Sequence, residues 1–219
     1  MKAASEQFKK HEGYYGNVGD DLIKLIPEDA KRVLDIGCGH GLIGKRLKET
    51  RLIEVVGIEV NPAAAEEAKK NLDKVYAIDI EAAKPDLNRG YFDCIIFGDV
   101  LEHLVNPWQT VKDMKEFLAP GGRVIISLPN ISHWPVIKSL MAGRWDYQRE
   151  GTLDITHLRF FTLESARKML EDAGLTIECS TNRLSCSKFF RKMNKLLRGR
   201  LTHLLAWQYL IVAKKPKHK

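Results

Sequence analysis

Apolar and polar positions alternate along this chain in blocks that predict strands and helices in turn. Short apolar runs predict seven strands, near residues 32–36, 54–58, 75–78, 94–98, 123–128, 176–181 and 207–213. Amphipathic segments predict helices over residues 18–26, 42–50, 62–71, 107–118 and 163–173. Because strands alternate with helices, we expect an α/β fold built on a mostly parallel sheet.

The first apolar run carries an acid near its end and then breaks into glycines. From position 33 to position 44 the chain reads Val-Leu-Asp-Ile-Gly-Cys-Gly-His-Gly-Leu-Ile-Gly. A glycine turn that opens a helix brings backbone N–H groups close to a ligand. The string fits two known loops, the dinucleotide fingerprint beginning at Gly39 and the S-adenosylmethionine (SAM) loop beginning at Asp35.

The position of Asp35 separates these two ligands. A carboxylate beside the glycines repels a pyrophosphate, whereas SAM carries an ammonium and a sulfonium that a carboxylate attracts. Three later runs are also followed by acids, at Glu59, Asp79 and Asp99. At the carboxyl edge of the sheet, Glu59 is placed to bind ribose hydroxyls. For Glu59 and Asp79 the alternative is capping of the helices that follow.

Further motifs follow in order over about a hundred residues. They read Tyr91-Phe92-Asp93, then Asp-Val-Leu-Glu-His-Leu at 99–104 and Leu-Ala-Pro-Gly-Gly-Arg-Val-Ile-Ile-Ser-Leu-Pro-Asn at 118–130. With the glycine loop, they make the chain resemble class I SAM-dependent methyltransferases, among them ubiquinone O-methyltransferases. The stretches 143–147 and 151–162 resemble a bacterial methyltransferase subfamily associated with glycan assembly. The resemblance implies a Rossmann-like α/β fold with a seven-stranded, mostly parallel sheet, an antiparallel last strand and helices on both faces.

The resemblance also implies which residues bind SAM. The glycine loop serves the methionine end, and Glu59 serves the ribose hydroxyls. Asp79 and Ile80 serve the adenine, while Asp99 and Val100 line the methionine side. The predicted cofactor-binding residues are Asp35, Gly37, Cys38, Gly39, Gly41, Glu59, Val60, Asp79, Ile80, Asp99 and Val100.

Residues 130–162 break the alternation of strands and helices. This long stretch has no clean period, and loops of such length are usually functional. It follows the fifth strand, so we expect a lid that forms the acceptor pocket. The alternative is a loop that packs its own tryptophans. The predicted acceptor-binding residues are Trp134, Arg144, Trp145, Tyr147 and Arg159.

Two histidines are candidates for a catalytic base, which methyl transfer needs only when the acceptor is a hydroxyl. His157, among the polar residues of the lid, is the first candidate and His103 the second, and for each the alternative is a structural role. Apart from Glu102 and His103, the sequence shows no tight carboxylate–histidine cluster, so no metal is expected. The four cysteines have no metal-ligand spacing either.

Positive charge is concentrated towards the C-terminal end. Residues 183–219 hold eleven lysines or arginines and no acid, whereas the whole chain has a net charge of +7. Apolar and basic residues recur at helical spacing over about 187–200, which predicts a basic amphipathic helix between the sixth and seventh strands. Three interpretations stay open: packing of its apolar face on the core, docking on an anionic membrane, and binding of nucleic acid.

Length and composition fit one catalytic domain over residues 1–219. The sequence shows no signal peptide or membrane-spanning run, so we expect a cytoplasmic protein, with possible peripheral contact at the inner face of the membrane through the basic helix. The expected activity is SAM-dependent methylation of a small-molecule, lipid-linked or glycan acceptor at a hydroxyl oxygen. The alternatives are a non-catalytic SAM-binding partner, a membrane adaptor and an RNA methyltransferase.

Overall fold

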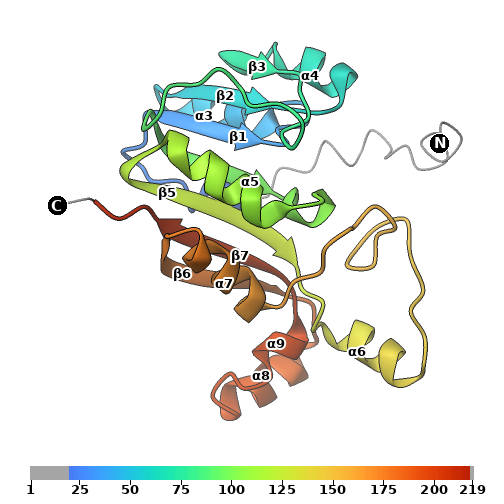
Figure 1. Cartoon of the computed structure of the whole chain (residues 1–219). Helices are drawn as coiled ribbons and strands as arrows, with labels where there is room; N and C mark the ends of the chain where they lie inside the picture. Colours follow the sequence, from blue (N-terminus) through green and yellow to red (C-terminus); the bar gives the residue numbers. More distant parts are fainter. Residues whose placement is uncertain (1–19, 218–219) are drawn as a thin grey trace, which may run out of the picture.

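One mixed sheet of seven strands runs through the computed structural model, which describes residues 20–217 (Figure 1). The strands are β1 (Arg32–Ile36), β2 (Glu54–Ile58), β3 (Lys74–Tyr76), β4 (Phe92–Gly98), β5 (Leu118–Pro129), β6 (Thr176–Leu184) and β7 (Ala206–Lys214). Their order across the sheet is β3-β2-β1-β4-β5-β7-β6. Neighbours from β3 to β5 are parallel, and β7 is antiparallel to β5 and β6. The predicted fold class is confirmed.

Helices cover both faces of this sheet. The α-helices of the described residues are α2 (Asp20–Ile23), α3 (Leu42–Thr50), α4 (Pro62–Ala68), α5 (Pro107–Met114), α6 (Trp134–Met141), α7 (Leu163–Asp172), α8 (Lys188–Leu196) and α9 (Thr202–Leu205). Leu47 of α3 and Ala68 of α4 belong to one apolar cluster. Met114 of α5 and Met169 of α7 belong to a second cluster. The sheet therefore separates two apolar layers.

The central strands are apolar on both sides because both faces are covered. In β4, Ile95 and Phe97 belong to the cluster shared with α5 and α7, while Ile96 belongs to the cluster shared with α3 and α4. Successive residues alternate because strand side chains point to opposite faces. Asp35 in β1 is an exception, since it is a carboxylate that is 1% exposed within an apolar strand.

Several predicted bounds shift in the structure. The first helix was expected over 18–26, of which 18 and 19 lie outside the described residues, and α2 ends at Ile23. The helix expected over 62–71 ends at Ala68, and the one expected over 107–118 passes at Met114 into a single 3-10 turn. The prediction that the lid has no periodic segment is wrong, because α6 forms there, with proline in its first turn.

The basic helix expected over 187–200 forms but is shorter, and a separate short helix follows it. Helix α8 ends at Leu196, and α9 begins at Thr202. Arg198 and Gly199 between them have left-handed backbone angles, φ 52° and φ 80°, which a helix cannot continue through. Figure 1 shows that α6, α8 and α9 extend beyond the end of the sheet at which β5 finishes.

Candidate functional site

The glycine loop joins β1 to α3 at the carboxyl edge of the sheet. Gly37, Gly39 and Gly41 all have positive φ, which side chains disfavour. A Cβ atom at Gly37 would lie 2.3 Å from Cγ2 of Val100. The N–H groups of Gly37 and Cys38 donate to the carbonyl of Ile58 at 2.7 and 3.1 Å. The loop is thus held between the ends of β2 and β4.

Glu59 follows β2 and is fixed by the main chain. Its Oε2 accepts the N–H of Gly39 at 2.9 Å, and its Oε1 accepts the N–H of Asn61 at 2.8 Å. Asn61 itself caps α4, since its side chain accepts from Ala63 and Ala64. The capping alternative is therefore wrong for Glu59, whose carboxylate instead joins the glycine loop to the end of β2.

Asp79 is placed by a local turn after β3. Its Oδ1 accepts the N–H of Glu81 at 2.9 Å, and no helix directly follows it in the described chain. The capping alternative is therefore wrong for Asp79 as well. The carboxylate of Glu81 accepts N–H groups of Val105 and Asn106 at 2.8 and 2.6 Å. These contacts tie the segment after β3 to the start of α5.

A cavity of about 960 Å³ opens beside the glycine loop, within the size range of small-molecule sites. Its wall contains most of the predicted cofactor-binding residues, namely Gly37, Cys38, Gly39, Glu59, Val60, Asp79, Ile80, Asp99 and Val100. Asp35 and Gly41 do not belong to the wall. Since Glu59, Asp79, Glu81 and Asp99 all contribute carboxylates, this side of the cavity favours a cationic ligand.

Asp35 lies in β1, just before the glycine loop, and its Oδ2 has no hydrogen-bond partner among the described residues. Burial and, secondarily, the charge of Glu59 raise the pKa of Asp35 to about 7. A cation held at the loop would stabilise the ionised carboxylate through space. Because Asp35 lies behind the wall, it acts on a bound cation through its charge and does not line the cavity.

Asp99 follows β4 in a left-handed conformation, with φ 54°. Its Oδ1 accepts hydrogen bonds from Oγ of Ser127 at 2.8 Å and from Nε2 of Gln208 at 2.6 Å. Gln208 in turn accepts from Nη1 of Arg183 at 2.6 Å. A strained backbone conformation persists only where surrounding contacts hold it in place. Here the contacts come from side chains of β5, β7 and, through Gln208, β6.

The part of the cavity around His103 contains residues that the predicted acceptor-binding set did not include. They are Arg149, Glu150, Thr156, Arg183 and Trp207, and they stand in one wall with His103. Trp207 was identifiable in principle, because the start of an antiparallel strand lies at the same edge as the ends of its parallel neighbours. Arg183 reaches the edge at the end of β6 for the same topological reason.

The five predicted acceptor-binding residues lie outside that wall. They are Trp134, Arg144, Trp145, Tyr147 and Arg159. Nε of Arg159 instead donates to the carbonyl of Val105 at 3.0 Å, with the guanidinium over the ring of Trp108. Trp145 packs against Phe160 with ring centroids 5.3 Å apart. Trp134, Trp145 and Tyr147 nevertheless remain exposed, so the lid does not bury these aromatic residues as the alternative interpretation expected.

The structure brings the two candidate histidines together. The rings of His103 and His157 are edge to face, with centroids 4.8 Å apart. Nδ1 of His103 lies 3.1 Å from the carbonyl oxygen of Thr156, and Nδ1 of His157 lies 3.1 Å from that of Thr152. Since a carbonyl only accepts, each Nδ1 carries the proton, and Nε2 is the basic atom of the neutral ring. His103 lines the cavity, whereas His157 is buried behind it.

Glu102 completes a cluster with these histidines. One potential ligand atom from each of Glu102, His103 and His157 lies within 4.8 Å of the other two. The expectation that no carboxylate–histidine cluster forms beyond Glu102 and His103 is therefore wrong, because the lid brings His157 across more than fifty residues of sequence. Two imidazoles and a carboxylate, with Nδ1 anchored to main-chain carbonyls, form a ligand set suited to a divalent transition metal.

Comparison with known proteins shows to which family this chain belongs. A family model described as a methyltransferase domain matches residues 11–180. The chain belongs to the class I SAM-dependent methyltransferase family. SAM is the cofactor of this methyltransferase family, and the residues present fit it: the acidic wall and the buried Asp35 suit its positive charge, and the glycines permit close approach of a ligand to the backbone.

Individual relatives agree with this assignment. The methyltransferase-family chain is 27% identical over 161 residues to a ubiquinone biosynthesis O-methyltransferase of Cereibacter sphaeroides, covering 71% of this chain and 64% of that protein. It is 29% identical over 123 residues to a ribosomal protein L11 methyltransferase of Thermosipho africanus, covering 52% and 46%. The chain thus matches less than two thirds of the length of either relative.

A solved structure gives the same fold over nearly the whole chain. A SAM-dependent methyltransferase from Archaeoglobus fulgidus superimposes with a TM-score of 0.69 at 22% identity, covering 98% of this chain and 99% of that one. At that identity the likeness concerns the fold. Within the described residues of the methyltransferase-family chain, no helix is long and apolar enough to span a bilayer.

Proposed function

We propose that this protein transfers the methyl group of SAM to a hydroxyl oxygen of a small-molecule or lipid-linked acceptor, such as a glycan precursor. The supporting observation is the position of His103, which shares one cavity wall with the predicted methionine-side residues Asp99 and Val100. A hydroxyl must lose a proton during methylation, and a neutral imidazole is suited to accept it. A base in this wall would be superfluous for an unprotonated amine.

In this proposal each side of the cavity has its own task. The glycine loop and Glu59 bind SAM, which when bound supplies an electrophilic methyl group on its sulfonium. His103 accepts the hydroxyl proton at Nε2 while the carbonyl of Thr156 keeps Nδ1–H in place. The adjacent carboxylate of Glu102 stabilises the imidazolium that results. The lid excludes water, so that positioning contributes to the rate.

The relatives favour a hydroxyl acceptor without naming it. The ubiquinone relative is an O-methyltransferase and matches 71% of this chain. The L11 relative takes its name from a protein acceptor, but it matches a smaller share, 52%. We therefore place a small hydroxyl compound before a protein as the acceptor.

The Glu102–His103–His157 cluster supports a second form of the same reaction. A divalent metal ion bound by these three side chains would act as a Lewis acid that lowers the pKa of the acceptor hydroxyl. The two forms are distinguished by prolonged dialysis against a chelator. A protein that uses His103 as a base keeps its activity after this treatment, whereas a metal-dependent protein loses it and regains it on addition of one particular ion.

The decisive test is transfer of radiolabelled methyl groups from SAM to fractions of a cell extract. We expect label in a small or lipid-extractable product, and no transfer by the His103→Gln variant. Alkaline treatment then identifies the bond, because a methyl ester releases volatile methanol whereas a methyl ether does not. Label in protein or RNA would contradict the proposed acceptor class. SAM binding without any transfer would favour a non-catalytic SAM-binding protein.

A further inference from the structure

Helix α8 leaves large apolar side chains exposed to solvent. The residue that it buries is the polar Asn194. Oδ1 of Asn194 accepts the N–H of Leu201 at 2.9 Å, and its Nδ2 donates to Oγ1 of Thr202 at 3.0 Å. Phe189 is 69% exposed and Leu196 is 83% exposed. The interpretation that the apolar face packs on the core is therefore wrong, because no residue of α8 belongs to either apolar cluster and Phe189 and Leu196 stay in solvent.

Basic side chains share this exposed helix. Lys188, Arg191, Lys192, Lys195 and Arg198 are all exposed. None of the ion pairs between described residues uses a side chain of α8. The sequence from 183 onward contains no acid that could neutralise them. An exposed apolar face with an uncompensated positive charge is thus the main property of α8.

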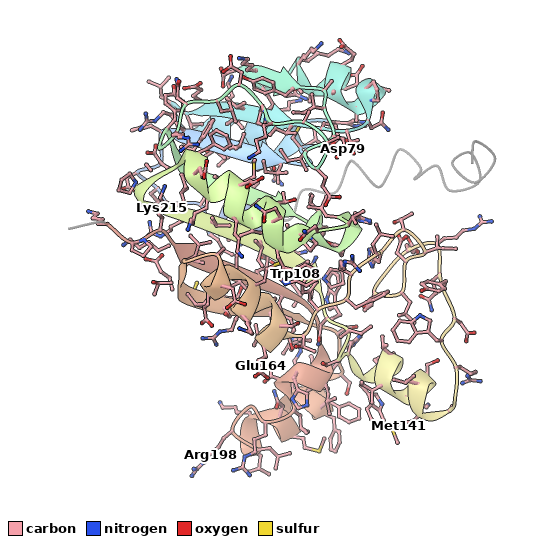
Figure 2. The ribbon with its side chains drawn as sticks, viewed as in Figure 1. Asp79, Trp108, Met141, Glu164, Arg198 and Lys215 are labelled. Carbon is pink, nitrogen blue, oxygen red and sulfur yellow. The ribbon has the colours of Figure 1, made fainter. Side chains whose placement is uncertain are left out.

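Helix α6 presents similar residues from another part of the chain. Met141 is 77% exposed, and Trp134 and Leu140 are also exposed. The segment 131–145 contains lysine and arginine but no acid. Figure 2 shows Met141 and Arg198 projecting at the end of the molecule farthest from β3.

Asn130 anchors both protrusions at one point of the sheet. It directly follows β5 and lies four residues before the start of α6. Its Nδ2 donates to the carbonyls of His203 and Ala206 at 2.7 Å each. Those carbonyls lie in α9 and at the start of β7. Trp207, which follows Ala206 in β7, belongs to the cavity wall. The exposed helices therefore connect directly to the acceptor side of the cavity.

We propose that α8 and α6 form a docking surface for an anionic lipid membrane. Exposed phenylalanine and leucine beside lysine and arginine is the composition of helices that lie in the headgroup region of a bilayer. The positive charge complements phosphate and anionic headgroups, whereas an apolar protein partner would leave it uncompensated. Docking here places the cavity near the surface from which an amphiphilic acceptor would enter. The inference concerns binding and does not rest on the proposed reaction.

Sedimentation with lipid vesicles tests this surface. The full-length protein should sediment with vesicles that contain phosphatidylglycerol, remain in solution with pure phosphatidylcholine vesicles, and dissociate as salt is raised. Replacing Lys188, Lys192, Lys195 and Arg198 together by glutamine should weaken binding roughly a hundredfold to a thousandfold, since each basic residue contributes about 1 kcal/mol at such a surface. SAM binding should be unchanged and serves as the check on folding.

Two further variants separate local docking from overall charge. The matched control replaces Lys24, Lys45, Lys112 and Arg167 by glutamine, which removes the same charge from exposed positions away from α8 and α6. It should bind vesicles as the unaltered protein does. The pair Phe189→Ser with Leu196→Ser keeps every charge and should weaken binding roughly tenfold to a hundredfold, because it removes the apolar contribution.

Three results would overturn the proposal. The first is equal loss of vesicle binding in the control quadruple variant, which would mean that net charge alone is responsible. The second is binding of RNA with a steep salt dependence but no binding of vesicles. The third is a dimer in solution that Phe189→Ser dissociates, since the apolar face would then be covered by a second copy of the chain.

Discussion

On the cofactor side of the cavity, Gly37, Glu59 and Asp79 each follow a different parallel strand at the same edge of the sheet. On the side proposed to bind the acceptor, Thr156 comes from the lid and Trp207 from the start of the antiparallel β7. The first side is positioned by main-chain hydrogen bonds close to strand ends. The second side joins segments far apart in sequence, since the N–H groups of Leu158 and Arg159 in the lid donate to the carbonyl of Glu102 at 2.8 and 3.0 Å.

This difference has a functional meaning. A shared cofactor requires one fixed arrangement, which the backbone of a parallel sheet provides. Acceptors differ among methyltransferases, and residues on a lid and on late strands vary without disturbing the sheet. Variants on the cofactor side should therefore change SAM affinity and stability, whereas variants on the acceptor side should change turnover and acceptor affinity.

The largest expected effect is on the acceptor side, at His103. Replacement by alanine should lower turnover about 10²- to 10⁴-fold, the usual contribution of a positioned base, and leave SAM affinity unchanged. Initial rates with the extracted acceptor and calorimetric SAM titration measure the two quantities. His133→Ala is the control, because His133 caps the start of α6 outside the cavity wall. An equal loss of SAM affinity would contradict the separation of the two sides.

The next effect concerns stability, at Asp35 on the cofactor side. The pKa of Asp35 is about 7 in the folded chain, against an ordinary value of 3.8, so folding takes up a proton between these two pH values. Its contribution to the free energy of unfolding is therefore fully present below pH 3.8 and is lost as pH rises through 7, at about 1.4 kcal/mol for each unit of pKa difference.

Urea unfolding at several pH values tests this prediction. The Asp35→Asn variant cannot ionise, so it should lose less stability than the unaltered protein between pH 5 and about 8. Asp29→Asn, at an exposed position, should keep the original dependence. Parallel curves for the unaltered protein and Asp35→Asn would show that Asp35 is not the group responsible.

A smaller effect is expected at Glu59. Alanine here should weaken SAM binding by roughly 1–3 kcal/mol, because charge-assisted hydrogen bonds to the ribose are lost. The glycine loop also loses a contact, since Oε2 of Glu59 accepts the N–H of Gly39. Calorimetric titration measures the change, with the exposed Glu66→Ala as control. Unchanged SAM affinity, or a preference for NAD, would overturn the cofactor assignment.

The smallest effect distinguishes two arginines of the lid. Arg149 lies in the cavity wall and Arg144 does not, although the sequence predicted an acceptor role for Arg144. Arg149→Ala should raise the KM for the acceptor up to about tenfold, through loss of roughly 1 kcal/mol of hydrogen bonding. Arg144→Ala should leave KM unchanged. The reverse result would mean that the acceptor binds outside this cavity.

The sequence alone was sufficient for the fold and for most of the cofactor wall. Apolar runs of strand length, glycines with positive φ and acids after strands are local signals, and parallel strands bring their carboxyl ends to one edge. Together with the resemblance to SAM-dependent methyltransferases, these signals predict one site from residues between Gly37 and Val100, and the cavity contains most of them. Asp35 and Gly41 are the exceptions, because a position behind the wall depends on packing.

Only the tertiary structure decided the acceptor side and the exposed helices. The contact between His103 and His157 joins positions more than fifty residues apart, and no local pattern encodes it. The periodicity of α8 predicted an amphipathic helix but not which way it faces. That direction depends on Asn194, which is buried by its hydrogen bonds to Leu201 and Thr202, while Phe189 stays in solvent. Periodicity identifies the faces of a helix, and contacts with distant parts of the chain decide which face is covered.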